Sequence, residues 1–166
     1  MIVIADTSPI NYLILIGEID VLPALYGRVL IPPSVLAELE NPRTPPLVRM
    51  WIARPPIWLE VREPSHAGDP QLSHLGAGER DAIILAEELH AEQLLIDEAP
   101  GRKEANRRHL PLTGTLGVLR EAAKQDLLDL MNAVMRLRKT TFYVSQTLFD
   151  RIVKEIESTG FGPTSE

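Results

Sequence analysis

The sequence contains no cysteine, and this absence removes several kinds of chemistry at once. A chain without thiols forms no disulfide, binds no metal through thiolates and has no cysteine nucleophile. It also has no apolar run approaching the roughly 20 residues that span a membrane. The N-terminal run MIVIADTSPI lacks a basic segment and reaches Asp6 early, so we expect no signal peptide. These features favour a cytoplasmic location.

An excess of positive charge is also missing, because the formal net charge is -6. A basic coat for nucleic acid is therefore absent, although divalent cations bound to carboxylates would still permit a nucleic-acid enzyme. Basic residues gather within 102–108 and 136–139. Such clusters are commonly solvated faces, but they are also the places to look for phosphate contacts. The candidates for contact with RNA phosphates are Arg102, Lys103 and Arg107.

Several familiar catalytic motifs are missing as well. There is no GxxxxGK[ST] loop for nucleotide phosphates and no GxSxG turn around a serine nucleophile. The four histidines have no i, i+4 pair of the zinc-binding kind, which favours surface or loop positions for them. They are His66, His74, His90 and His109.

Short apolar runs alternate with amphipathic stretches along all of the chain. The runs typical of buried strands are 1–5, 28–31, 58–63, 93–97 and 110–113. The stretches with helical character are 9–17, 18–26, 35–40, 46–54, 78–91, 100–108, 115–125, 127–138 and 145–158. Ser8 and Pro9 are expected to cap and open the first helix. This alternation predicts a parallel sheet wrapped by helices in a single domain, 1–158, with a disordered tail, 159–166.

Acidic residues stand at the points where such a sheet places its ligands. Asp6 and Asp97 each follow an apolar strand, and the carboxyl ends of parallel strands form the binding edge. Glu38 lies in the helix after the second strand, and Glu79 and Asp81 lie at a helix start. Each acid alone is explained by turn capping, solvation or the helix dipole. Gathered in one cleft, they would repel one another unless Mg²⁺ or Mn²⁺ neutralised them, and such ions support phosphodiester hydrolysis.

These acids stand in runs that resemble the PIN-domain family. The runs are Asp6-Thr7-Ser8, IPPSVLAEL, LGAGERDAI and LLIDEAPGRKEA, and they occur in family order between residue 3 and about residue 125. The later segment TGTLGVLREAAKQDLL resembles a prokaryotic subgroup related to the VapC-type toxin ribonucleases.

The resemblance implies a three-layer α/β/α sandwich with extra C-terminal helices and a Mg²⁺- or Mn²⁺-dependent endoribonuclease activity. It assigns catalysis and metal binding to Asp6, Glu38, Asp81 and Asp97. Glu79 and Glu98 would be auxiliary metal ligands, and Glu98 is an alternative to Asp97 as the fourth acid. Hydroxyl groups of Thr7, Ser8 and Thr113 would support these acids.

Two other functions fit parts of the sequence. The first is a non-catalytic PIN-fold module that binds RNA or protein. The second is an aspartyl phosphatase, although the DxD pattern of such an enzyme is absent after the first strand. The resemblance also implies an antitoxin protein as a partner. The apolar side chains within 127–158 exceed what a helical pair on its own core needs, which favours a homodimer.

Overall fold

The computed structural model describes residues 1–66 and 68–159. The chain divides into two compact units, residues 1–115 and residues 116–166, and the second is described as far as Thr159. Nothing in this division tests the expectation of one domain over 1–158, which stays a prediction. The expected disordered tail concerns 159–166; Thr159 ends a helix, and 160–166 lie outside the described residues.

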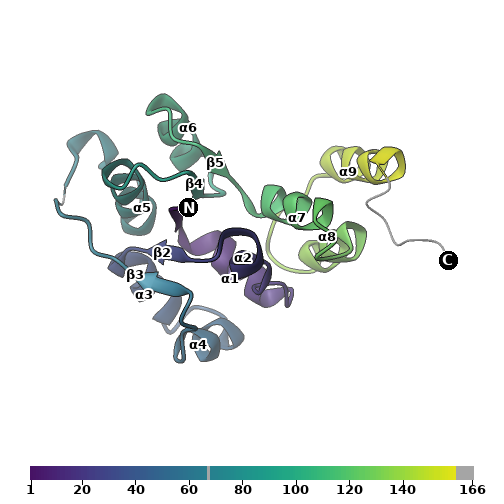
Figure 1. Ribbon diagram of the computed structural model, residues 1–166, viewed down its shortest axis with the longest axis horizontal. Coiled ribbons are helices and arrows are strands. Elements are labelled where there is room, and N and C mark those ends of the chain that lie inside the picture. Colours follow the sequence, from purple (N-terminus) through teal and green to yellow (C-terminus); the bar gives the residue numbers. More distant parts are fainter. Residues whose placement is uncertain (67, 160–166) are drawn as a thin grey trace. The chain divides into compact units, whose positions relative to one another are not determined.

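A five-stranded parallel sheet forms the centre of the first unit, in the order β3-β2-β1-β4-β5 (Figure 1). The strands are β1 (Val3–Ala5), β2 (Val29–Ile31), β3 (Leu59–Val61), β4 (Gln93–Leu95) and β5 (Leu112–Thr113). Each lies within one of the five runs that the sequence predicts. Residues Val3–Ala5 of β1 face Gln93–Leu95 of β4, and Ile4 also pairs with Leu30 of β2. The expected parallel α/β class is therefore confirmed.

The direction in which the chain adds strands to the sheet reverses at β1. The chain passes from β1 to β2 and β3 on one side, and then returns to β4 and β5 on the other. In open parallel sheets, ligands bind outside the carboxyl ends of the strands at such a switch point. The segments that leave β1 and β4 are therefore the place to look for a site.

The helices of the first unit fill the connections between these strands. They are α1 (Thr7–Leu15), α2 (Val21–Tyr26), α3 (Pro33–Glu40), α4 (Pro46–Ile52), α5 (Ala77–Glu88) and α6 (Ala99–Arg107), with a 3₁₀ turn η1 (Pro70–Leu72). The expected start of the first helix is wrong, because α1 begins directly after Asp6. Asp6 has an extended backbone, and Pro9 lies in the first turn, where a helix needs no N–H donor.

Burial explains why the central strands are apolar throughout. All three residues of β1 and all three of β2 are buried, as expected for strands covered on both faces. Ile4 and Leu94 pack with Ile83 of α5, and α5 contacts both β1 and β4. The core thus holds α5 against the two strands that flank the switch point.

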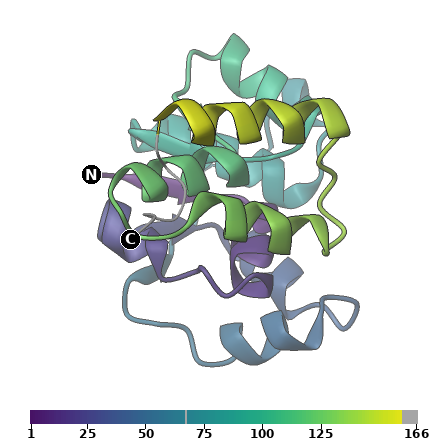
Figure 2. The ribbon, with the colours of Figure 1, turned by 90° about the vertical axis from the view of Figure 1, so that its right-hand side faces the viewer.

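The second unit consists of helices that lie side by side in both ribbon views (Figures 1 and 2). They are α7 (Thr115–Lys124), α8 (Leu130–Arg138) and α9 (Gln146–Thr159). The Asp129 side chain caps α8 by accepting from Asn132 N–H at 3.1 Å, and the Arg138 guanidinium lies 4.0 Å from the Phe149 ring centre. Within the described part of the chain, every helix is too short or too polar to traverse a lipid bilayer.

Candidate active site

Asp6 leaves β1 at the switch point and is almost completely buried. Its backbone N–H donates to Leu95 O at 2.9 Å, which extends the pairing of β1 with β4 by one residue. The side chain is 3% exposed, interacts with the Thr7 N–H and forms none of the hydrogen bonds by which a side chain caps a helix. Capping therefore does not account for Asp6, and its carboxylate is held in a place that costs solvation.

Glu38 reaches from α3 to two other helices. Thr7 Oγ1 donates a short hydrogen bond to Glu38 Oε2, and Gly78 N–H donates to Glu38 Oε1 at 3.1 Å. A Cβ atom on residue 78 would lie 2.6 Å from Glu38 Oε2, so only glycine lets the carboxylate rest against the first turn of α5. Thr7 and Gly78 together fix the direction of Glu38.

Glu79 and Glu98 come from the starts of α5 and α6. Glu79 Oε2 is buried and has no hydrogen-bond partner among the described residues. A Cβ atom on residue 101 would lie 2.6 Å from this oxygen, so Gly101 leaves the room that the Glu79 carboxylate occupies. Glu98 precedes α6, and its side chain forms no capping hydrogen bond. The carboxyl groups of Glu79 and Glu98 also lie close enough to interact with each other, so the two helix starts bring two acids together.

These four carboxylates line one pocket of about 240 Å³. The lining residues are Asp6, Thr7, Ser8, Asn11, Tyr12, Glu38, Gly76, Glu79 and Glu98. No Lys, Arg or His stands among these lining residues. Burial, together with repulsion from Glu79, Glu38 and Glu98, raises the pKa of Asp6 to about 7. Burial and repulsion from Glu98 and Glu38 likewise raise the pKa of Glu79 to about 7.

The sequence that forms this fold and pocket matches a known protein family. A model of the PIN-domain family matches residues 2–158. The chain belongs to the PIN-domain family. PIN domains are commonly nucleases and generally use divalent metal ions. The expected family is thereby confirmed, whereas the VapC-type subgroup stays a prediction.

One solved structure resembles this PIN domain in fold. It is a PilT N-terminus domain protein from the hyperthermophilic archaeon Sulfolobus solfataricus P2, with a TM-score of 0.54. The two sequences are 16% identical, and the match covers 74% of this chain and 93% of the other. At this identity the likeness concerns the fold alone, and it agrees with the expected three-layer α/β/α sandwich. Among curated proteins, no relative matches the chain significantly.

The PIN domain brings together only part of the acid set expected from its sequence. Asp6 and Glu38 line the pocket, and the expected auxiliary acids Glu79 and Glu98 line it with them. Asp81 does not line it and instead forms an ion pair with Arg80 Nε at 3.0 Å. The structure thus places Glu79 and not Asp81 at the pocket, and the roles expected of the two acids stay a prediction. Arg80 adjoins both acids in the sequence, so charge pattern alone could not tell which one it neutralises.

Asp97 accepts hydrogen bonds from Thr115, the first residue of α7. Its Oδ1 accepts from Thr115 N–H at 2.7 Å, and its Oδ2 accepts from Thr115 Oγ1 at 2.7 Å. Thr115 is fully buried, so these bonds fix the start of α7. The hydroxyl that supports this acid belongs to Thr115. Glu98, one residue on, faces the pocket.

The expected phosphate contacts have different surroundings. Arg102 Nη1 donates to Ile96 O at 2.9 Å, and Arg107 forms an ion pair with Glu104 at 2.6 Å. Lys103 is exposed and lines a separate cavity. Contact of these residues with RNA stays a prediction. Lys103 is the best placed of them, because neither an ion pair nor a hydrogen bond holds its ammonium group among the described residues.

The pocket suits a hard divalent cation in chemistry. Its four carboxylates offer oxygen ligands, and no cationic side chain stands among the lining residues. Glu79 Oε2 is a buried acceptor without a hydrogen-bond partner among the described residues. Among the described residues, however, no three His, Asp or Glu side chains already stand close enough together to hold one ion. Ligation by three of them would therefore require side-chain rotation toward a shared point.

Proposed function

We propose that this PIN domain is a Mg²⁺- or Mn²⁺-dependent endoribonuclease that hydrolyses phosphodiester bonds of single-stranded RNA. The observation that supports this most is the set of four carboxylates, from four separate chain segments, that share one pocket without a cation among its lining residues. Repulsion of this kind destabilises a fold and is tolerated where ions or chemistry use it. The proposed metal ligands are Asp6, Glu38, Glu79 and Glu98.

Asp6, Glu79 and Glu38 would have different roles in metal binding. Asp6 and Glu79 are partly protonated near pH 7 in the metal-free protein and would release these protons as they take up a divalent ion. Glu38 is oriented beforehand by Thr7 and Gly78, so its carboxylate needs little rearrangement. A bound ion would supply a Lewis acid for the scissile phosphate and a lower pKa for the attacking water.

The physiological role that we propose is that of a toxin in a type II toxin–antitoxin pair in the cytoplasm, with an antitoxin protein and a second copy of the chain as partners. The run TGTLGVLREAAKQDLL supports the toxin role by its resemblance to that subgroup. Exposed apolar side chains in the second unit support self-association. They are Leu127, Met135 and Tyr143, which are 42%, 46% and 83% exposed.

Two residues of the same helix provide the test of the proposed activity. Glu38 lines the acidic pocket, whereas Glu40 is exposed and lies outside it. Glu38→Gln, like Asp6→Asn, should abolish cleavage of single-stranded RNA in Mg²⁺ or Mn²⁺, and Glu40→Gln should cleave at the wild-type rate. If Asp6→Asn and Glu38→Gln cleave as fast as the wild type, the assignment of the pocket is wrong.

A non-catalytic module that binds RNA or protein is the second candidate. It is favoured by one observation, that no three acids or histidines among the described residues are already placed around one point. Calorimetric titration with Mn²⁺ separates the two functions. A nuclease should take up Mn²⁺ and lose this uptake in Asp6→Asn, whereas a binding module should take up none.

A further inference from the structure

A second cavity lies next to the acidic pocket and has a different character. Its volume is about 500 Å³, and it is lined by His74, Ala99, Pro100, Lys103 and Glu104. This volume lies within the range of about 300 to 1,000 Å³ typical of small-ligand sites. Nearby residues of the same two segments line the two sites. Glu98 and Gly76 line the acidic pocket, and Ala99 and His74 line this cavity.

The charges around this cavity favour an anion. Lys103 is exposed, and no ion pair occupies its ammonium group among the described residues. Glu104 is buried and is paired with Arg107 at 2.6 Å and with Arg108 at 2.8 Å. These guanidinium groups lower the pKa of Glu104 to about 2 and match its charge. Lys103 therefore remains the group that can meet a phosphate at the mouth of the cavity.

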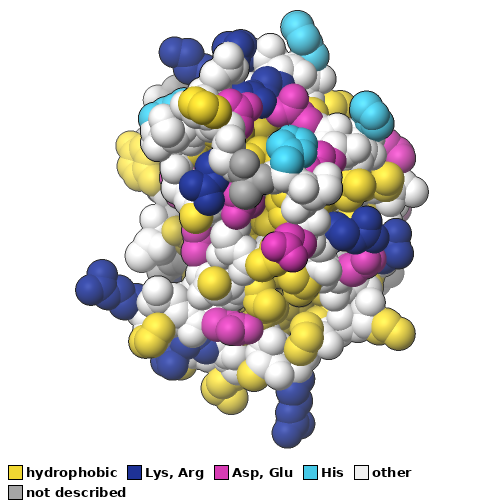
Figure 3. Space-filling view, turned by 90° about the vertical axis from the view of Figure 1, so that its left-hand side faces the viewer, with side chains coloured by type: hydrophobic (Ala, Val, Ile, Leu, Met, Phe, Trp, Pro, Cys, Tyr) yellow, Lys and Arg dark blue, Asp and Glu magenta, His cyan; other side chains and the backbone are white. Residues whose placement is uncertain are grey.

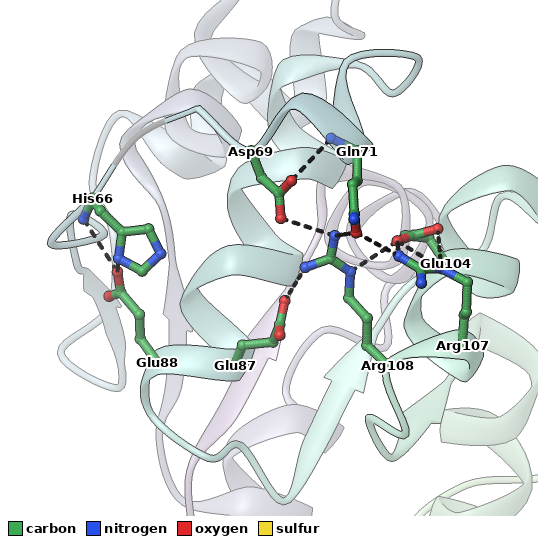
Figure 4. A network of polar contacts seen from close by, with 8 residues as sticks. All are labelled: His66, Asp69, Gln71, Glu87, Glu88, Glu104, Arg107 and Arg108. Atoms are coloured by element: carbon green, nitrogen blue, oxygen red, sulfur yellow. Dashed lines mark hydrogen bonds and ion pairs between the residues drawn. The ribbon is translucent and has the colours of Figure 1, made fainter.

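The wall that carries His74 is anchored before any ligand binds. Arg108 joins three segments by ion pairs with Asp69 at 2.9 Å, with Glu104 at 2.8 Å and with Glu87 (Figure 4). Asp69 in turn accepts from Gln71 N–H at 2.9 Å at the start of η1. The loop before α5 is thus tied to both α5 and α6. Such anchoring lowers the ordering cost of binding.

Figure 3 shows the distribution of charged side chains over one face of the molecule. Acidic, basic and histidine side chains intermingle over its upper half, and hydrophobic side chains are more continuous below them. Because neither sign dominates, long-range attraction would contribute little to binding on this face.

We propose that this second cavity is the subsite for the nucleotide adjoining the scissile phosphate of single-stranded RNA. Lys103 and His74 contact its phosphate, and Ala99 and Pro100 pack against its ribose and base. This inference rests on the proposed nuclease function. It also gives a reason for a cation beside a pocket of four carboxylates, since those acids repel the phosphates that flank the cut.

Substitution of Lys103 tests the subsite, with Lys154 on α9 as an exposed control lysine. The measurements are kcat and KM for cleavage of a short single-stranded RNA in Mn²⁺, and the salt dependence of RNA binding by fluorescence anisotropy without metal. Lys103→Glu should raise KM and Kd at least about tenfold, leave kcat within about threefold and reduce the salt slope by about one. Lys103→Arg and Lys154→Glu should remain within about threefold of wild type.

The possible results separate this inference from the proposed function. If the wild type cleaves RNA while Lys103→Glu keeps the wild-type KM and salt slope, the subsite is overturned and the nuclease stands. An equal rise of KM in Lys103→Glu and Lys154→Glu also overturns the subsite, because only net charge then matters. If the wild type neither cleaves nor binds RNA, the proposed function fails and the subsite fails with it.

Discussion

Two clusters of acids in this PIN domain have the same residue types and opposite electrostatics. In the acidic pocket, burial and neighbouring carboxylates raise the pKa of Glu79 to about 7. In the cluster around Arg108, two guanidinium groups lower the pKa of Glu104 to about 2. The two glutamates belong to neighbouring helices, α5 and α6. The presence of a cationic partner, and not the residue type, separates a structural acid from a candidate for chemistry.

This contrast gives each cluster a different dependence on its partners. The Arg108 cluster is complete within the chain, so removal of one member leaves a charge unmatched. The acidic pocket is incomplete within the chain, so removal of one member relieves repulsion in the metal-free protein.

The largest effect concerns the stability of the metal-free protein as a function of pH. The pKa of Asp6 rises from 3.8 to about 7 on folding, so between these values the folded state holds a proton that the unfolded state has lost. The penalty is absent below about pH 4, grows up to pH 7 and is complete above it. At 1.36 kcal/mol per pH unit, it amounts to at most about 4 kcal/mol.

Asp6→Asn should therefore gain stability over the wild type as pH rises from 4 to 8 without metal. Urea unfolding at each pH, with EDTA present, measures the difference. If the unfolding free energies of the two proteins change in parallel with pH across this range, the pKa of Asp6 is not raised by folding. With Mn²⁺ added at pH 8, only the wild type should become more stable.

The next effect concerns metal affinity and decides between Glu79 and Asp81. Glu79→Gln removes a carboxylate from the pocket and should weaken Mn²⁺ binding about 100-fold, or about 2.7 kcal/mol. Asp81→Asn removes only the partner of Arg80 and should change the affinity by less than about threefold. Calorimetric titration of both variants measures the order. The reverse order would restore Asp81 as the ligand expected from the sequence.

A smaller effect is expected for Arg108, the residue at the centre of its ion-pair cluster. The Arg108 side chain is 11% exposed and bonds to Asp69, Glu87 and Glu104. Arg108→Ala leaves three acids with fewer partners and should cost about 2 kcal/mol of unfolding free energy in urea, discounted because the cluster is partly solvated. A loss no larger than that of an exposed arginine would mean that the cluster is not a structural anchor.

The smallest effect is expected for the neighbouring arginine. Arg107 also bonds to Glu104, but its side chain is 56% exposed, so water replaces its contacts readily. Arg107→Ala should keep the wild-type unfolding midpoint within error and serves as the matched control for Arg108→Ala. A loss as large as that of Arg108→Ala would show that pairing of Glu104, rather than the joining of three segments, stabilises this region.

Sequence reasoning could predict the fold because its signals are local and repeated. Apolar runs such as MIVIA mark strands buried on both faces, and acids at their ends mark the binding edge. Asp6 could be placed in this way. Ser8 as a helix cap could not, because the helix start is set by the backbone of Asp6. The joining role of Arg108 was also beyond the sequence, since its partners lie on three separate segments.

The sequence by itself determined the short buried strands, the acids at their carboxyl ends and the runs typical of a PIN domain. Only the tertiary structure decided which acid of each close pair faces the pocket. Residues 79 and 81 point about 160° apart on a helix, so packing selects one of them. Asp97 and Glu98 are separated by a single peptide, and the Thr115 hydroxyl and N–H claim Asp97. Glu98 is left to the pocket because hydrogen-bond partners distant in sequence orient its neighbour.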